Sequence, residues 1–97
     1  MNYNSAHEAV YTTKIAGFFS EMKNLSWDDL QIFAHVARAG GLSGAAETLS
    51  LSAPTIGRRM LSLEQAVGKP LFVRSRTGYA LTDKGQSLLR KVQAMEA

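Results

Sequence analysis

The chain of 97 residues is long enough for one small domain, and its 45% hydrophobic and 20% charged residues favour packing over disorder. It contains no cysteine, which excludes disulfide scaffolds, thiol nucleophiles and iron–sulfur sites, and its two histidines, His7 and His35, lie too far apart to predict a metal or cofactor site. The net charge of +3 is uneven, because residues 1–50 carry 3 basic and 5 acidic side chains whereas residues 51–91 carry 8 and 2, and this favours a polyanionic partner for the second half.

The first predicted segment is an N-terminal extension over residues 1–22, whose apolar residues recur at helical spacing. These residues are Val10, Tyr11, Ile15, Phe18, Phe19 and Met22. An amphipathic helix of this kind could cover a hydrophobic patch or mediate self-association, and a frayed tail is equally compatible with the pattern. The sequence leaves these three interpretations open.

A helix is predicted over residues 27–39. Ser26 can cap its first turn, where Asp28 and Asp29 place negative charge at the positive end of the helix dipole. Its apolar residues recur at three- and four-residue steps, and they are Leu30, Phe33, Val36 and Ala37. Gly40 and Gly41 end the helix, because glycine accepts the left-handed conformation that follows a last helical turn.

Two further helices follow, joined by a turn of only two residues, Leu51 and Ser52. The first is predicted over about residues 44–50, with Ser43 as its cap. The second is predicted over residues 53–67, because Ser52 can cap it and Pro54 suits its first turn. Steps of four, three and four give this helix a buried stripe, which consists of Ile56, Met60, Leu63 and Val67.

The hydrophobic period changes between Pro70 and Thr82, where two short β-prone runs, residues 71–73 and 79–81, flank a polar turn at 74–78. A last helix is predicted over residues 83–97. Its apolar stripe has little left to pack against in so small a domain, so the sequence predicts a homodimer joined by antiparallel packing of this helix. The seam would consist of Leu81, Leu88, Val92 and Met95.

Three helices with tight turns and a small hairpin make up the winged helix-turn-helix plan, so we predict a mainly α fold over residues 23–82 with a β-hairpin wing. The third helix has small residues at its amino end, and Arg58 and Arg59 follow within reach of guanine or phosphate. The wing, residues 71–81, presents Arg74 and Arg76 at its tip for the DNA backbone or the minor groove. The predicted function is sequence-specific binding of double-stranded DNA, with the third helix in the major groove.

From residue 30 to residue 85 the chain closely resembles the DNA-binding domain of the bacterial LysR-type transcriptional regulators. The segments that carry the resemblance are Gly41-Leu42-Ser43-Gly44-Ala45-Ala46, Ser52-Ala53-Pro54-Thr55-Ile56, Leu71-Phe72-Val73-Arg74 and Leu81-Thr82-Asp83-Lys84-Gly85. The resemblance implies a dimeric winged helix that regulates transcription. It also implies that the last helix is a linker to an effector-binding domain, so a small-molecule effector would act only through a domain absent from these residues.

The predicted DNA-contacting residues combine the chemistry of the third helix and wing with the positions that the resemblance supplies. They are Ser43, Ser52, Ala53, Pro54, Thr55, Gly57, Arg58, Arg59, Arg74 and Arg76. Three positions depart from the family pattern: Ala53 stands where Gln is frequent, Gly57 where Ser is common, and Thr77 where the wing usually has Arg. Ala53 can therefore only touch a thymine methyl group or allow close approach to the DNA, and Gly57 lacks a hydroxyl for phosphate.

Other function classes are disfavoured by what the sequence lacks. No apolar run reaches the ~18–20 residues needed to span a bilayer, and the first ten residues lack a signal-peptide pattern, so we expect a cytoplasmic protein without a membrane partner. Paired catalytic carboxylates and a phosphate loop are also missing, so we expect no enzyme. The alternative is a winged helix that uses the same basic face to bind an acidic protein.

Overall fold

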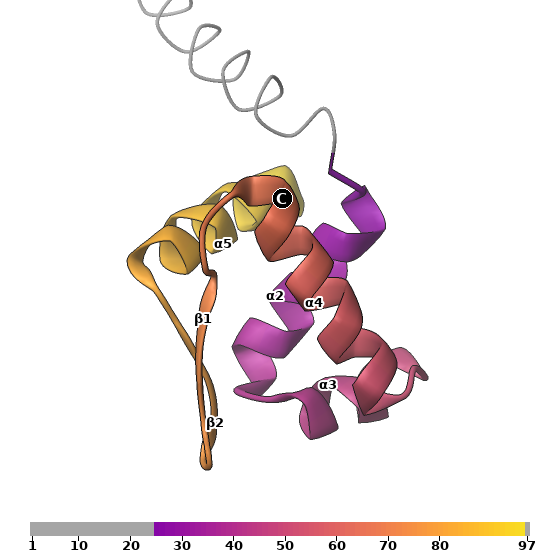
Figure 1. Ribbon diagram of the computed structural model, residues 1–97. Coiled ribbons are helices and arrows are strands. Elements are labelled where there is room, and N and C mark those ends of the chain that lie inside the picture. Colours follow the sequence, from indigo (N-terminus) through magenta and orange to yellow (C-terminus); the bar gives the residue numbers. More distant parts are fainter. Residues whose placement is uncertain (1–24, 97) are drawn as a thin grey trace, which may run out of the picture.

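The computed structural model describes residues 25–96, so the predicted extension at 1–22 lies outside the described residues. The elements in chain order are α2 (Trp27–Ala39), α3 (Leu42–Leu49), α4 (Ala53–Val67), β1 (Phe72–Ser75), β2 (Gly78–Leu81) and α5 (Asp83–Glu96). The helices gather around one core, and the antiparallel hairpin of β1 and β2 extends beside them (Figure 1). The predicted mainly α fold with a hairpin wing is confirmed. None of the helices within residues 25–96 is long and apolar enough to cross a membrane.

The ends of α2 and α4 form where the sequence predicts them. The backbone N–H of Asp29 donates to Ser26 Oγ at the start of α2, and the N–H of Thr55 donates to Ser52 Oγ at the start of α4. Each helix ends on a glycine in the left-handed conformation, Gly40 after α2 and Gly68 after α4. Local capping chemistry therefore determines the length of both helices.

Helix α3 departs from the prediction at both ends. It begins at Leu42 instead of residue 44, because the extended backbone of Gly41 already provides the turn into the helix. Ser43 therefore lies exposed inside the first turn and is not the cap, and no side chain caps this helix. The helix ends at Leu49, and Ser50 takes the left-handed conformation instead of continuing it.

The turn of the hairpin is shorter than predicted. Ser75 pairs with Gly78, so only Arg76 and Thr77 connect the strands, and Arg74 lies within β1 instead of at the tip. The turn is closed locally, because Ser75 Oγ accepts a hydrogen bond of 3.3 Å from the N–H of Thr77. The expectation that residues 74–78 form a polar turn is therefore wrong.

Backbone hydrogen bonds join the start of β2 to the end of α2 and continue the pairing of the two chain segments beyond the open end of the hairpin. The N–H of Tyr79 donates to the carbonyl oxygen of Gly40 at the end of α2, at 2.9 Å, and the N–H of Thr82 donates to Leu71 O at 3.1 Å. Gly78 lies so close to α2 that a Cβ atom on it would collide with the Gly40 carbonyl. The wing therefore has a defined position relative to the helices.

Helix α5 completes the core. Leu88 is 5% exposed and Val92 is fully buried, and both belong to the same hydrophobic cluster as Phe33, Ile56 and Met60. Leu81 is partly buried against that cluster, whereas Met95 is 39% exposed. The expectation that this stripe has little to pack against within the domain is therefore wrong for Leu88 and Val92, because α5 packs against α2 and β2.

Candidate nucleic-acid interface

One side of α4 faces solvent along its whole length. Ile56, Met60 and Leu63 bury the opposite side in the core. The exposed positions follow each other at steps of four, three, one, three and one, and they are Pro54, Arg58, Leu61, Ser62, Gln65 and Ala66. The helix therefore presents a continuous surface to a partner, with the arginine near its amino end and an apolar side chain, Leu61, near its middle.

The amino end of α4 holds Arg58 in a defined direction. The Ser52 hydroxyl donates to Thr55 Oγ1 at 2.8 Å, and Arg58 Nη2 donates to the same oxygen at 3.4 Å. The guanidinium of Arg58 is therefore drawn back toward the helix amino terminus, whose free N–H groups favour an anion. The structure thus brings together four of the predicted site residues: Ser52, Pro54, Thr55 and Arg58.

Arg59 lies on a different side of α4 and faces the start of α2. Its Nε donates to Asp29 Oδ1 at 2.7 Å and its Nη2 donates to Asp28 Oδ2 at 2.8 Å. The hydrogen bond with Asp28 outweighs partial desolvation and raises the pKa of Arg59 above its ordinary value. This guanidinium joins two helices, so its charge is already compensated within the domain.

Arg74 is also compensated within the domain. Its Nη2 lies 2.8 Å from Glu64 Oε1, and its guanidinium carbon lies 5.0 Å from the centre of the Tyr79 ring. Arg76 occupies the exposed two-residue turn instead. Within residues 25–96, no carboxylate forms an ion pair with Arg58 or Arg76.

The small residues on α4 serve helix packing. Ala53 and Gly57 are partly buried, and a Cβ atom on Gly57 would lie 3.2 Å from Leu42 Cδ1 of α3. Gly57 therefore allows α3 to approach α4 closely, and Ser43 follows Leu42 on the exposed side of α3. Sequence reasoning did not include Leu61 and Gln65 among the site residues, although their spacing from Arg58 places them on the same helix face.

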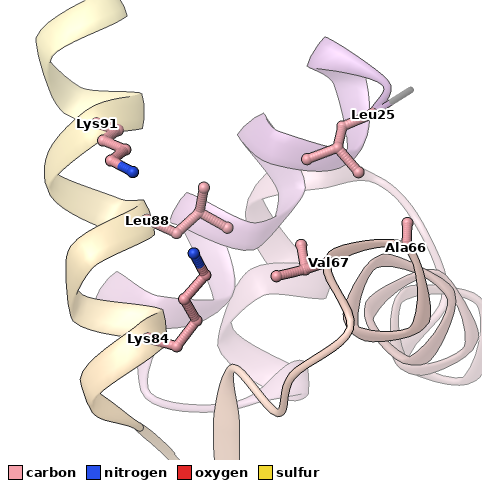
Figure 2. Close-up of a pocket in the computed structure, with 6 residues that line it drawn as sticks. All are labelled: Leu25, Ala66, Val67, Lys84, Leu88 and Lys91. Carbon is pink, nitrogen blue, oxygen red and sulfur yellow. The ribbon is translucent and has the colours of Figure 1, made fainter. Parts of the chain in front are cut away.

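A separate hollow lies at the other end of α4. Figure 2 shows its lining side chains, which come from the start of the described chain, the carboxyl end of α4 and one side of α5. The hollow measures about 140 Å³ and is lined by Leu25, Ala66, Val67, Lys84, Leu88 and Lys91. None of the residues predicted to contact DNA lines it, so it is not part of the candidate interface.

Residues 27–86 match the family described as bacterial regulatory helix-turn-helix protein, lysR family. The chain belongs to the LysR family. Two curated relatives of this LysR-family chain are the transcriptional activator CmpR of Synechocystis sp., 38% identical over 68 residues, and the transcriptional activator BauR of Pseudomonas aeruginosa, 40% identical over 68 residues. Each alignment covers 70% of this chain but 22% of the relative, so the LysR-family chain spans about a fifth of their length.

Solved structures give the same family and the same fold. The crystal structure of a complex between the CbnR DNA-binding domain and DNA superposes on this LysR-family chain with a TM-score of 0.71 and 35% sequence identity. That match covers 74% of this chain and 83% of the CbnR domain. Full-length CbnR gives a TM-score of 0.70, and 25% of its chain is covered.

Proposed function

We propose that this LysR-family chain binds double-stranded DNA sequence-specifically and regulates transcription in the bacterial cytoplasm without catalysing a reaction. Helix α4 would enter the major groove, and the wing would lie on the backbone or in the minor groove. The observation that carries the proposal is Arg58, which is exposed on α4, held by Thr55 and without an ion-pair partner among residues 25–96. The DNA complex of the similar CbnR domain supports it.

Selection of bound sequences from a pool of random duplexes tests this function. We expect enrichment of one sequence with two-fold symmetry, because a single reading helix covers only a few base pairs and two copies would double the footprint. Binding of the enriched duplex should weaken steeply as salt rises. A pool that shows no enrichment, or binding that is independent of salt, would favour an acidic protein as the partner.

Replacement of Arg58 by alanine should weaken binding of the selected duplex by about 1–3 kcal/mol, because a bidentate contact to guanine contributes that much discrimination. Affinity for a random-sequence duplex should fall much less. Arg90→Ala is the matched control, since Arg90 is an exposed arginine on α5, outside α4 and the wing. Titrations with both duplexes measure the effect. If the affinity for the two duplexes fell equally, Arg58 would contact a phosphate and would not read a base.

We also propose a homodimer, with α5 as part of its joint. Leu88 and Val92 cannot contact a second subunit because they lie in the core of their own domain. The dimer interface would therefore use the exposed side of α5 around Met95. Sedimentation equilibrium should show a dimer for the full chain and a shift toward monomer for Met95→Asp. A dimer that is unaffected by this substitution would place the joint elsewhere.

A further inference from the structure

The carboxylate of Glu64 connects α4 to the wing. Glu64 lies in the last turn of α4, and its side chain is only 10% exposed. Its Oε2 accepts hydrogen bonds from the N–H groups of Leu71 and Phe72, at 2.8 and 3.2 Å. Its two oxygens also accept a bidentate pair from Arg74, at 3.2 and 2.8 Å. One side chain of the proposed reading helix therefore binds the start and the middle of β1.

These hydrogen bonds satisfy groups that the sheet leaves open. The hairpin is a two-stranded sheet, so β1 has a strand neighbour on one side only. Its other edge faces α4, where unpaired N–H groups would be costly to bury. Because Leu71 is buried beside Phe72, the Glu64 carboxylate supplies an acceptor at a place that water reaches poorly.

The same contact cancels the charge of Arg74. Burial raises the pKa of Glu64, but the hydrogen bonds from Arg74, Leu71 and Phe72 together hold that pKa below its ordinary value. The carboxylate is therefore ionised at neutral pH. The bidentate pair occupies two of the five N–H donors of the guanidinium and compensates its charge, and the Tyr79 ring lies against one face of it. Arg76, in the turn, has no such partner among the described residues.

We propose that Glu64 is a positioning residue that fixes the wing relative to α4 and neutralises Arg74, so that Arg76 is the wing arginine that binds phosphate. This inference rests on the proposed DNA-binding function. It replaces the sequence-based expectation that Arg74 contacts the DNA directly. Arg74 acts through Glu64 and Tyr79, on the shape of the wing.

The charge assignment is tested by the salt dependence of binding to a random-sequence duplex. Each phosphate contact adds about 0.9 to the slope of log affinity against log salt. Arg76→Gln should flatten the slope by about 0.9, and Arg74→Gln should leave it unchanged. Glu64→Gln, which frees the Arg74 charge, should steepen the slope by about 0.9, and the double variant Glu64→Gln with Arg74→Gln should restore it.

Glu96→Gln is the control for the salt experiment, because it breaks a different ion pair, with Arg38, outside α4 and the wing. Its slope should equal that of the unmodified chain. A slope that flattens in Arg74→Gln as much as in Arg76→Gln would overturn the proposal, since Arg74 would then leave Glu64 and bind phosphate. The two arginine variants leave Glu64 itself intact, so they decide the matter even if Glu64→Gln folds poorly.

The positioning role is tested on the free protein, without DNA. Hydrogen exchange of the Leu71 amide should accelerate in Glu64→Ala, while Glu64→Gln should keep most of its protection because an amide oxygen still accepts. Unchanged exchange of the Leu71 amide in Glu64→Ala would contradict the positioning role of Glu64. If the chain bound no DNA at all, the proposed function would fail, yet this measurement would still show whether Glu64 holds the wing.

Discussion

Replacing Val92 by aspartate is expected to unfold the domain, not to separate two folded subunits. Val92 is fully buried in the cluster that α5 shares with α2 and α4. A lone carboxylate in such a place costs several kcal/mol, and the whole stability of a small domain is about 5–15 kcal/mol. The variant should therefore lose its cooperative thermal transition by circular dichroism, at any protein concentration.

Met95→Asp is the matched control for this experiment. Met95 lies on the same helix, three residues further on, and is exposed, so the same substitution there should leave the transition in place. A Val92→Asp chain that remained folded and became monomeric would contradict the packing described above. That result would instead place Val92 in the dimer interface that the sequence alone predicts.

Replacing Gly78 by alanine should destabilise the domain by about 2–5 kcal/mol, because two costs add. Gly78 has a φ of +136°, which L side chains rarely adopt, and a Cβ atom would also collide with the carbonyl oxygen of Gly40. That oxygen accepts the hydrogen bond from Tyr79, so the wing would have to move away from the end of α2. Urea unfolding measures the loss.

Gly68→Ala separates the two costs in the Gly78 experiment. Gly68 also has a positive φ, +85°, but a Cβ atom there would have nothing within 4 Å. Its replacement should cost only the left-handed backbone penalty, about 1–2 kcal/mol. Equal losses at the two glycines would mean that the wing tolerates displacement from α2.

The features that sequence reasoning predicted correctly are local ones. Serine caps at 26 and 52 and glycine ends at 40 and 68 act within one helical turn, so the residues that form them also reveal them. The helix-turn-helix with its hairpin follows from the order of these signals. The start of α3 was missed because Gly41 gives an entry without a side-chain cap, for which the sequence has no positive signal.

The features that sequence reasoning missed depend on contacts between distant residues. Arg59 and Asp29 are 30 residues apart, and nothing in the local sequence shows that the guanidinium meets that carboxylate instead of DNA. The periodicity of Leu88 and Val92 predicts a stripe but does not tell which surface covers it. For the contact between Glu64 and Arg74 the sequence does offer one signal, because Glu64 is one of only two acidic residues between positions 51 and 91.

The burial of α5 has a mechanical consequence. Leu88 and Val92 anchor its middle in the core, and Arg38 at the end of α2 binds Glu96 in its last turn, 58 residues away in the chain. A force applied to the end of α5 therefore acts on α2 and on β2 through these contacts. A protein segment joined after α5 would therefore be coupled to the domain through the contacts of α5 with α2.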